Sequence, residues 1–161
     1  LGDVYKRQSL NINDLTELIL KRLRPIARKK DVEVVFESVR PVVAEVDEVK
    51  MTLIMTNLVE NAIKYNKDHG WVKVILDADH QYFTFEVSDS GIGIPEEALA
   101  HICERFYRVD KSHSREIGGT GLGLAIARNA ILLHRGSIKI DSEEGQGTVF
   151  TVKIPIIYVS K

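Results

Sequence analysis

Residues 118–124 read Gly-Gly-Thr-Gly-Leu-Gly-Leu and run directly into an apolar pattern with helical spacing. A glycine-rich turn of this kind exposes backbone N–H groups at the positive end of the following helix, where phosphate binds readily. Two further segments lie upstream: Asp89-Ser90-Gly91-Ile92-Gly93-Ile94-Pro95 and, before it, Asn57-Leu58-Val59-Glu60-Asn61-Ala62. The glycine turn alone is a weak signal, but the three segments in this order predict a nucleotide site with three separate walls.

The earliest of these segments places two amides and a cation on one side of a helix. The pattern predicts that helix over residues 48–66, after an N-cap at Asp47. Asn57, Asn61 and Lys64 fall within about 60° of one another around it. Amide oxygens suit Mg²⁺ as ligands, and an ammonium meets phosphate as a point charge. A plain solvated helix face has the same pattern, so both interpretations stay open here.

Asp89 comes at the end of a predicted strand in which Phe83, Phe85 and Val87 alternate with polar residues. A carboxylate held there accepts a hydrogen bond from an exocyclic amine. Adenine presents such an amine, whereas guanine presents an acceptor that the carboxylate repels. Gly91 and Gly93 let the backbone turn sharply and approach a ligand. An Asp-Ser-Gly sequence is also common turn chemistry, so a simple turn cap is the alternative.

Residues 106–120 have little apolar period and carry Arg108, Lys111 and Arg115. Loops of this length in compact domains are usually functional lids or disordered. Because this one is cationic and ends on the glycine turn, it fits a flap that closes over a triphosphate. A solvated basic loop is the alternative. Gly145-Gln146-Gly147-Thr148 is a second glycine turn, which more often forms a plain hairpin loop than a site.

Bulk properties limit the function classes. The chain has 161 residues, 44% of them hydrophobic and 28% charged, which is enough for one domain with a core. Its net charge of -1 gives no support to nucleic-acid binding. Its one cysteine, Cys103, excludes an internal disulfide, and no Cys/His cluster has the ligand spacing of zinc. No apolar run approaches the ~18 residues of a membrane span, so we expect no membrane insertion by this chain.

The order of predicted elements indicates a two-layer α/β sandwich, because strands that arrive in hairpins favour a mixed or mostly antiparallel sheet with helices on one face. Residues 1–8 are predicted to be a linker or a cloning remnant, and residues 9–161 the domain. The predicted elements are a helix over 13–30, strands over 32–39 and 42–46, the helix 48–66, strands over 71–78 and 82–88, a helix over 95–104, the loop 106–120, a helix over 121–134 ended by Gly136, and strands over 137–142 and 148–156.

With these motifs in place, residues 9–156 resemble the catalytic ATP-binding domain of a two-component sensor histidine kinase. That domain belongs to the superfamily named after gyrase, a heat-shock chaperone, histidine kinases and MutL. Five motifs match in order: the N-box over 57–65, the first glycine box over 89–95, the F-box region over 104–110, the second glycine box over 119–124 and the third over 145–148. The resemblance implies a Bergerat-type fold, with a five-stranded mixed, mostly antiparallel sheet covered on one face by three helices.

The resemblance also implies roles at matching positions. Asn61 would ligate Mg²⁺, with Asn57 supporting the metal or phosphate, and Asp89 would bind the adenine amine with Thr148 nearby through water. Phosphate contacts would come from Arg108 in the lid and from backbone amides of the second glycine box. The nucleotide-binding set implied in this way is Asn57, Asn61, Lys64, Tyr65, Asp89, Gly91, Gly93, Ile94, Arg108, Gly119, Thr120, Gly121, Leu122, Gly123, Leu124 and Thr148; Asn57, Asn61, Lys64 and Arg108 are the catalytic candidates.

Members of this family transfer the ATP γ-phosphoryl group to a histidine on a preceding dimerisation domain, in a His-Glu/Asp-x-Arg-Thr/Ser-Pro setting. The five histidines here lack that setting and are predicted to be loop or surface residues: His69, His80, His101, His113 and His134. The resemblance therefore implies a phosphoryl-donor half. Its partners would be that dimerisation domain and a response regulator, and its place the cytoplasmic part of a membrane-anchored bacterial sensor kinase.

Two other functions stay open at this stage. The chain fits a nucleotide-binding regulatory module without transferase activity, since every binding element would survive without chemistry. It also fits, less well, an ATPase that uses water as acceptor. Relatives of that kind commonly have a glutamate at the position of Asn57, whereas Glu60 lies about 60° away around the helix.

Overall fold

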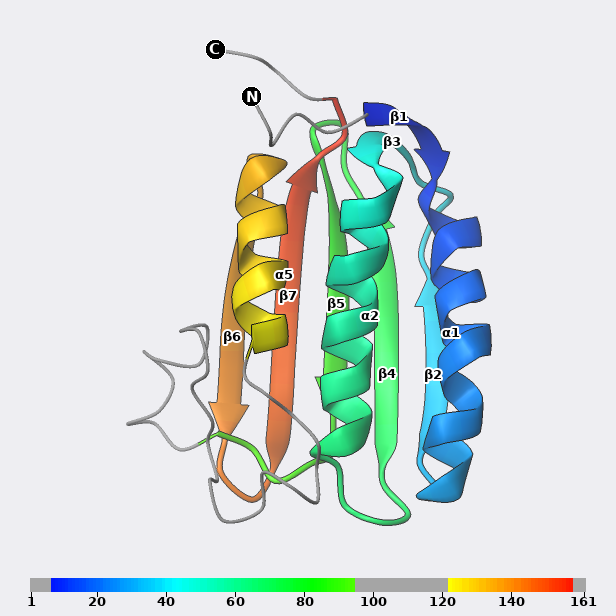
Figure 1. The fold of residues 1–161 in the computed structure, drawn as a ribbon, viewed down its shortest axis with the longest axis vertical. Coiled ribbons are helices and arrows are strands. Elements are labelled where there is room, and N and C mark those ends of the chain that lie inside the picture. The colour runs from blue at the N-terminus through cyan, green and yellow to red at the C-terminus, as the bar shows by residue number, and fades with distance from the viewer. Residues whose placement is uncertain (1–6, 95–121, 158–161) are drawn as a thin grey trace.

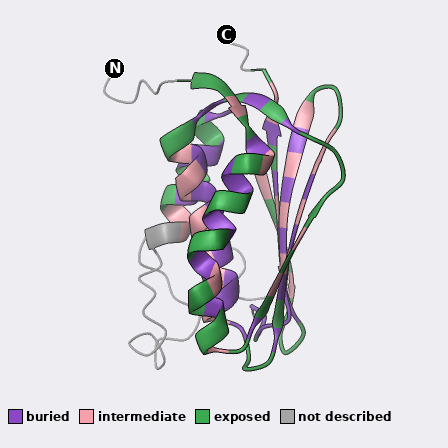
Figure 2. Ribbon diagram, turned by 90° about the vertical axis from the view of Figure 1, so that its right-hand side faces the viewer, coloured by how far each residue is buried: buried purple, intermediate pink, exposed green. Residues whose placement is uncertain are grey.

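The protein forms two layers, a sheet and a set of helices that cover one face of it, in a computed structural model that describes residues 7–94 and 122–157. The five-stranded sheet has the order β2-β4-β5-β7-β6 (Figure 1). Figure 2 shows the helices together on one side, with their buried residues turned toward the strands. The predicted sandwich is thus confirmed. The elements are β1 (Arg7–Asn11), α1 (Ile12–Lys29), β2 (Glu33–Ser38), β3 (Val43–Asp47), α2 (Glu48–Lys64), β4 (Trp71–Ala78), β5 (Tyr82–Asp89), α5 (Leu122–Leu133), β6 (Ser137–Glu143) and β7 (Gly147–Pro155).

The sheet is mixed because one of its pairs is parallel. Strand β2 pairs with β4 in parallel, whereas β4–β5, β5–β7 and β6–β7 are antiparallel. Alternate residues of each strand face the helices and fill the core, since successive side chains of a strand point to opposite faces. Phe83, Phe85 and Val87 of β5 are all buried in this way. The alternation that predicted this strand is therefore the alternation that builds the core.

The strand expected over 42–46 is not part of the five-stranded sheet. It forms β3, which pairs antiparallel with β1 in a separate two-stranded sheet. Strand β1 was not predicted, and it includes Arg7 and Gln8, which were expected to be part of a linker. The reason is physical: four of the five side chains of β1 are exposed, so the strand has backbone pairing but no apolar alternation to reveal it.

Helix α2 lies across the middle of the sheet and carries the paired asparagines. Its N-cap is Asp47, as predicted, and a side-chain oxygen of Asp47 accepts a hydrogen bond from the Lys50 N–H at 3.0 Å. One face of α2 is apolar and buried. This burial fixes the rotation of the helix about its axis. It therefore also fixes the positions of the polar side chains Asn57, Asn61 and Lys64. The buried stripe consists of Met51, Ile54, Met55, Leu58, Val59, Ala62 and Ile63.

Helix α5 was predicted to end at Gly136, and the structure shows how the cap is formed. The residue with a left-handed conformation is Arg135, with φ of 60°. The Gly136 N–H donates to Ile131 O at 2.9 Å and the Arg135 N–H to Leu132 O at 2.9 Å, which is the Schellman pattern. Gly136 is needed for another reason: a Cβ there would lie 2.6 Å from Lys153 O on β7.

His134, predicted to be a loop or surface residue, is instead 2% exposed. Its Nε2 accepts a hydrogen bond from the Asp47 N–H at 3.0 Å, and its Nδ1 therefore donates to Ala130 O at 2.8 Å. Burial lowers the pKa of His134, which favours this neutral form. The hydrogen bond between His134 and Asp47 joins the end of α5 to the start of α2. Because the two residues are far apart in the sequence, no local sequence pattern predicts the contact.

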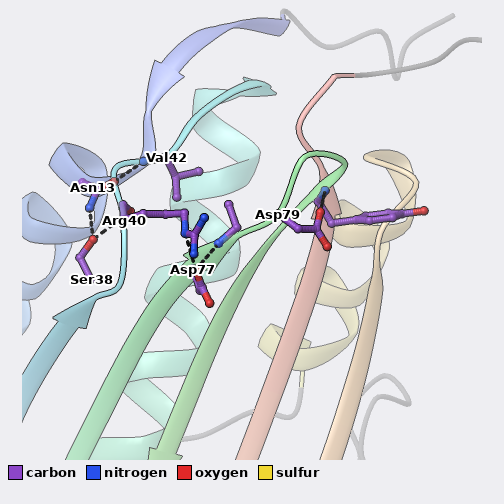
Figure 3. A network of polar contacts seen from close by, with 8 residues as sticks. Asn13, Ser38, Arg40, Val42, Asp77 and Asp79 are labelled. Carbon is purple, nitrogen blue, oxygen red and sulfur yellow. Dashed lines mark hydrogen bonds and ion pairs between the residues drawn. The ribbon is translucent and has the colours of Figure 1, made fainter.

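The end of the sheet that carries the β4–β5 turn has a polar network of its own (Figure 3). The Asn13 side chain accepts a hydrogen bond from the Val42 N–H at 2.7 Å, and Arg40 pairs with Asp77 at 3.1 Å. Asp79 closes the β4–β5 turn by accepting hydrogen bonds from the Gln81 and Tyr82 N–H groups, both at 2.8 Å. These contacts fix the turn geometry at the end of the sheet away from Asp89.

We predict opposite effects for two adjacent substitutions at the end of α5. Gly136→Ala should lower the free energy of unfolding by about 1–3 kcal/mol, because the new Cβ collides with backbone. Arg135→Gly should leave stability unchanged or raise it by up to about 1 kcal/mol, because glycine adopts a left-handed conformation without strain. Denaturant unfolding of both variants checks this. The same stability loss in both would contradict the assignment of the left-handed residue.

Candidate nucleotide-binding site

The helix-facing side of the sheet changes from apolar to polar at one end. Val87, Phe150 and Ile140 form an apolar row across β5, β7 and β6. Two residues further along each strand, the next row on the same face is Asp89, Thr148 and Ser142, in which Asp89 pairs with Thr148 and Thr148 with Ser142. We call these three residues the polar row. It ends the core and begins the candidate site.

Asp89 is the buried charge of the polar row, with 8% of its surface exposed. Burial raises the pKa of Asp89 to about 6, although hydrogen bonds from the backbone N–H groups of Gly91 and Thr148 act in the opposite direction. The Gly91 N–H donates to Oδ1 at 2.8 Å. A carboxylate removed from water in this way gains from any further donor that reaches it. The site is thus suited to a ligand with an N–H group.

The other two members of the polar row are joined through their hydroxyl groups. Ser142 Oγ and Thr148 Oγ1 lie 2.8 Å apart, and Ser142 Oγ also lies 3.1 Å from Gly147 O. The Ile94 N–H donates to Ser142 Oγ at 2.7 Å. Ser142 was not among the predicted site residues. The sequence did contain a signal for it. Ser142 follows Ile138 and Ile140 at the inward-facing positions of β6, and a hydroxyl at the third such position breaks the apolar pattern.

Several glycines of the motifs permit close packing of backbone on backbone. A Cβ on Gly147, whose φ is 126°, would lie 2.0 Å from Asp89 O, and one on Gly93, whose φ is 75°, would lie 2.2 Å from Glu143 O. The Gly145 N–H donates to Ile92 O at 2.7 Å. Residues 90–94 and 143–147 are therefore pressed together beside Asp89. The predicted nucleotide contacts of Gly91 and Gly93 stay predictions.

A second buried cluster supports the turn that follows Asp89. Ser90 Oγ accepts a hydrogen bond from the Trp71 N–H at 2.8 Å and donates to Asn66 Oδ1 at 3.1 Å. The Asn66 side-chain amide donates to Trp71 O at 2.9 Å. Asn66 and Ser90 are 4% and 6% exposed, so these bonds satisfy groups that water does not reach. Nothing in the local sequence distinguishes Asn66 from an ordinary residue after a helix.

The C-terminal end of α2 lies at the same end of the molecule as Asp89 (Figure 1). The Ile92 N–H donates to Tyr65 O at 3.1 Å, which joins the first glycine box to the N-box. Asn57, Asn61, Lys64 and Tyr65 are half-buried there. The structure thus brings the N-box and Asp89 together. Lys30, which was not predicted, donates from Nζ to Lys64 O at 2.8 Å and caps this helix end.

The second glycine box is described only in part. Arg108, Gly119, Thr120 and Gly121 lie outside the described residues, as do the predicted helix 95–104 and loop 106–120. Leu122 and Gly123 begin α5, and Leu124 packs against the core. The predicted helix after the glycine turn is therefore confirmed, while the phosphate contacts of the turn stay predictions.

The described residues offer no metal site made of His, Cys, Asp and Glu side chains, and an open hollow among them lies away from Asp89. Within 7–94 and 122–157, no group of three or more His, Cys, Asp or Glu side chains is arranged to hold a metal ion. A metal here would depend on amide oxygens such as that of Asn61 and on phosphate. An open hollow of about 500 Å³ at the other end of the sheet is lined by residues such as Arg40, His80 and Ile156, none of them predicted site residues. No helix in the described part of the chain has the length and apolar character to span a bilayer.

These features are those of an ATP-binding domain, and the chain belongs to the family of histidine kinase-, DNA gyrase B- and HSP90-like ATPases, whose sequence profile matches residues 46–157. Sensor histidine kinase WalK of Bacillus subtilis (strain 168) is 36% identical over 154 residues, which are 94% of this chain. Sensor histidine kinase RppB of Synechocystis sp. is 43% identical over 113 residues, which are 70% of this chain. The resemblance to the ATP-binding domain of a sensor histidine kinase is confirmed.

Solved structures agree with this assignment. The catalytic domain of histidine kinase ThkA superposes with a TM-score of 0.82 at 29% identity, covering 94% of this chain and 96% of that one. Full-length ShkA in complex with AMPPNP gives a TM-score of 0.85 at 26% identity and covers 100% of this chain but 33% of its own. The chain likewise spans 25% of the length of WalK and of RppB.

We predict that Asp89→Asn stabilises the ligand-free chain. Because the folded pKa of about 6 lies above the ordinary value of 3.8, the folded state holds the Asp89 proton more tightly. The resulting stability is fully present below about pH 4 and is lost as pH rises through 6. At pH 7.5 the Asp89→Asn variant, which is uncharged at this position, should therefore be more stable than the wild type by about 3 kcal/mol, and at pH 4 most of this gain should be lost.

Denaturant unfolding at the two pH values measures the effect. Asp141→Asn on the exposed part of β6 is the matched control, with no expected change beyond about 0.5 kcal/mol. An Asp89→Asn variant that is less stable than the wild type by the same margin at both pH values would contradict the burial argument.

Proposed function

We propose that this chain is the phosphoryl-donor half of a two-component histidine kinase. It would bind ATP and donate the γ-phosphoryl group to a histidine on a separate dimerisation domain. The observation that carries the proposal is the buried carboxylate of Asp89 at the polar end of the sheet, next to the N-box end of α2. The family assignment supports ATP as the nucleotide.

Asp89 would select the base. Its ionised carboxylate accepts a hydrogen bond from the exocyclic amine of adenine and repels the carbonyl oxygen that guanine has there. Thr148, directly across the β5–β7 ladder, would bind the base together with Asp89. At pH 7 Asp89 is mostly ionised, since the pKa of its carboxyl group is about 6. Adenine selectivity should therefore weaken as pH falls through 6.

The triphosphate would lie toward α2 and the start of α5. Asn61 would ligate Mg²⁺ through its amide oxygen, with Asn57 beside it, because amide oxygens are hard ligands that Mg²⁺ accepts. Bound Mg²⁺ would neutralise charge on the phosphates during transfer. Lys64, Arg108, Thr120 and the backbone amides of residues 119–123 would hold the phosphates. The main catalytic work of these groups is positioning and charge stabilisation.

The acceptor and the downstream partner would lie outside this chain. Relatives with the same domain are named sensor histidine kinases and are about three to four times as long, since the matched 154 and 113 residues are 25% of WalK and of RppB. A structure of ThkA is in complex with the response regulator protein TrrA. By analogy, a dimerisation domain of the same parent would supply the histidine, and a response regulator would receive the phosphoryl group. A cytoplasmic location in a membrane-anchored parent is part of the proposal.

Phosphoryl transfer to a separately produced dimerisation domain tests this function. With labelled ATP and Mg²⁺, we expect label on the acceptor histidine. Asn61→Ala should reduce the rate at least tenfold through loss of a metal ligand. Glu60→Gln, at the adjacent half-buried position of α2, is the matched control and should transfer normally. GTP should compete poorly with ATP in the wild type.

Each contrary result has a distinct meaning. ATP binding without label on the acceptor would favour a regulatory module instead. Rapid release of inorganic phosphate by the chain alone, abolished by Glu60→Gln, would favour an ATPase that uses water. Equal competition by GTP would overturn the assignment of Asp89 to the adenine amine.

A further inference from the structure

Ser142 is the point where three parts of the candidate site meet. Its hydroxyl accepts a hydrogen bond from the Ile94 N–H at 2.7 Å, which holds the end of the first glycine box. It lies 2.8 Å from Thr148 Oγ1 and 3.1 Å from Gly147 O, both in the third glycine box. Its strand, β6, is at the edge of the sheet and contributes no other residue to the polar row. A hydroxyl here, after two inward isoleucines, is unexpected for a residue that only fills the core.

The protons of this hydroxyl pair have two possible arrangements. Ser142 Oγ has one proton to donate, and the Ile94 N–H already occupies one of its acceptor positions. If the Ser142 proton goes to Gly147 O, Thr148 must donate to Ser142 and offers a ligand only an acceptor. If the Ser142 proton goes to Thr148 Oγ1, the Thr148 proton is free to be donated to a ligand. Ser142 therefore determines whether the Thr148 hydroxyl can donate a hydrogen bond to a ligand or can only accept one.

Adenine selects between these arrangements. Next to its exocyclic amine, which Asp89 would accept, the adenine ring has an unprotonated nitrogen, N1, that requires a donor. Thr148 faces Asp89 across the β5–β7 ladder and can supply that donor directly or through one water, provided that Ser142 donates to it. We propose that Ser142 is a positioning residue for adenine recognition, which acts by orienting the Thr148 hydroxyl as a donor toward N1. This rests on the proposed binding of ATP at Asp89.

The matched probe is 1-deaza-ATP, in which a C–H group replaces N1. Calorimetric titration with Mg²⁺ should show that the wild type binds ATP about five- to tenfold more tightly than 1-deaza-ATP, the effect of one buried hydrogen bond. In Ser142→Ala the Thr148 hydroxyl keeps its proton but loses the partner that directs it, so this ratio should fall to about two- to threefold. Ser142→Thr keeps the hydroxyl, suits a strand, and should restore the ratio.

The ratio of the ATP and 1-deaza-ATP affinities distinguishes a role of Ser142 in orienting Thr148 from a role in the general stability of the site. Ser142→Ala also removes the acceptor of the Ile94 N–H, but a loosened turn would weaken both nucleotides by the same factor. Thr148→Val removes the donor itself and should bring the ratio to within about twofold of unity, and the double variant should match Thr148→Val, because Ser142 acts only through Thr148. Ser142→Cys, of similar size and with a weak donor, provides a second test if the alanine variant unfolds.

Ser88→Ala, which removes a half-buried hydroxyl from β5 outside the polar row, is the control and should leave the ratio unchanged. A wild type that fails to bind ATP would overturn the proposed function and, with it, this inference. A wild type that prefers ATP over 1-deaza-ATP, combined with a Ser142→Ala variant that keeps the same preference, would overturn the inference alone.

Discussion

The burial of one carboxylate, that of Asp89, is the constraint on which the rest of the site depends. A charge removed from water at the end of an apolar sheet face destabilises the ligand-free protein unless donors reach it. Here two backbone N–H groups do so, and yet the pKa of Asp89 is raised to about 6. The fold thus maintains an incompletely compensated acceptor at a fixed position. We propose that a base with an amine would compensate it, which would convert a cost in stability into selectivity for the ligand.

Holding that acceptor in place requires dense packing around it. Glycine at 147 lets the β7 backbone come against Asp89 O, and glycine at 91 lets the next turn come against Tyr65 O at the end of α2. The Asn66, Ser90 and Trp71 cluster fixes the same turn from the other side. Two motifs far apart in the sequence, 57–65 and 89–95, are in this way parts of one rigid wall. Rigid support of this kind is what a recognition site needs.

The sequence predicted most of the fold and part of the site. Strands β4, β5, β6 and β7 and helices α1, α2 and α5 were found because a buried face imposes its period on the residues. Strand β1 was not, since backbone pairing without burial has no period. Asp89 and the N-box were identified through motifs, whereas Ser142, Asn66 and the buried His134 act through contacts distant in sequence. Likewise the need for glycine at 136 comes from its packing against β7, while the left-handed residue is Arg135 before it.

The most direct test of this account is the titration of the Asp89 carboxyl group itself by carbon-13 NMR, with Asp89→Asn used to assign its signal. In the ligand-free chain the account predicts a pKa of about 6, well above the ordinary 3.8. With ATP bound the pKa should fall, since the adenine amine favours the ionised form. An ordinary pKa in the ligand-free chain, or one that ATP leaves unchanged, would contradict the claim that this buried carboxylate recognises the base.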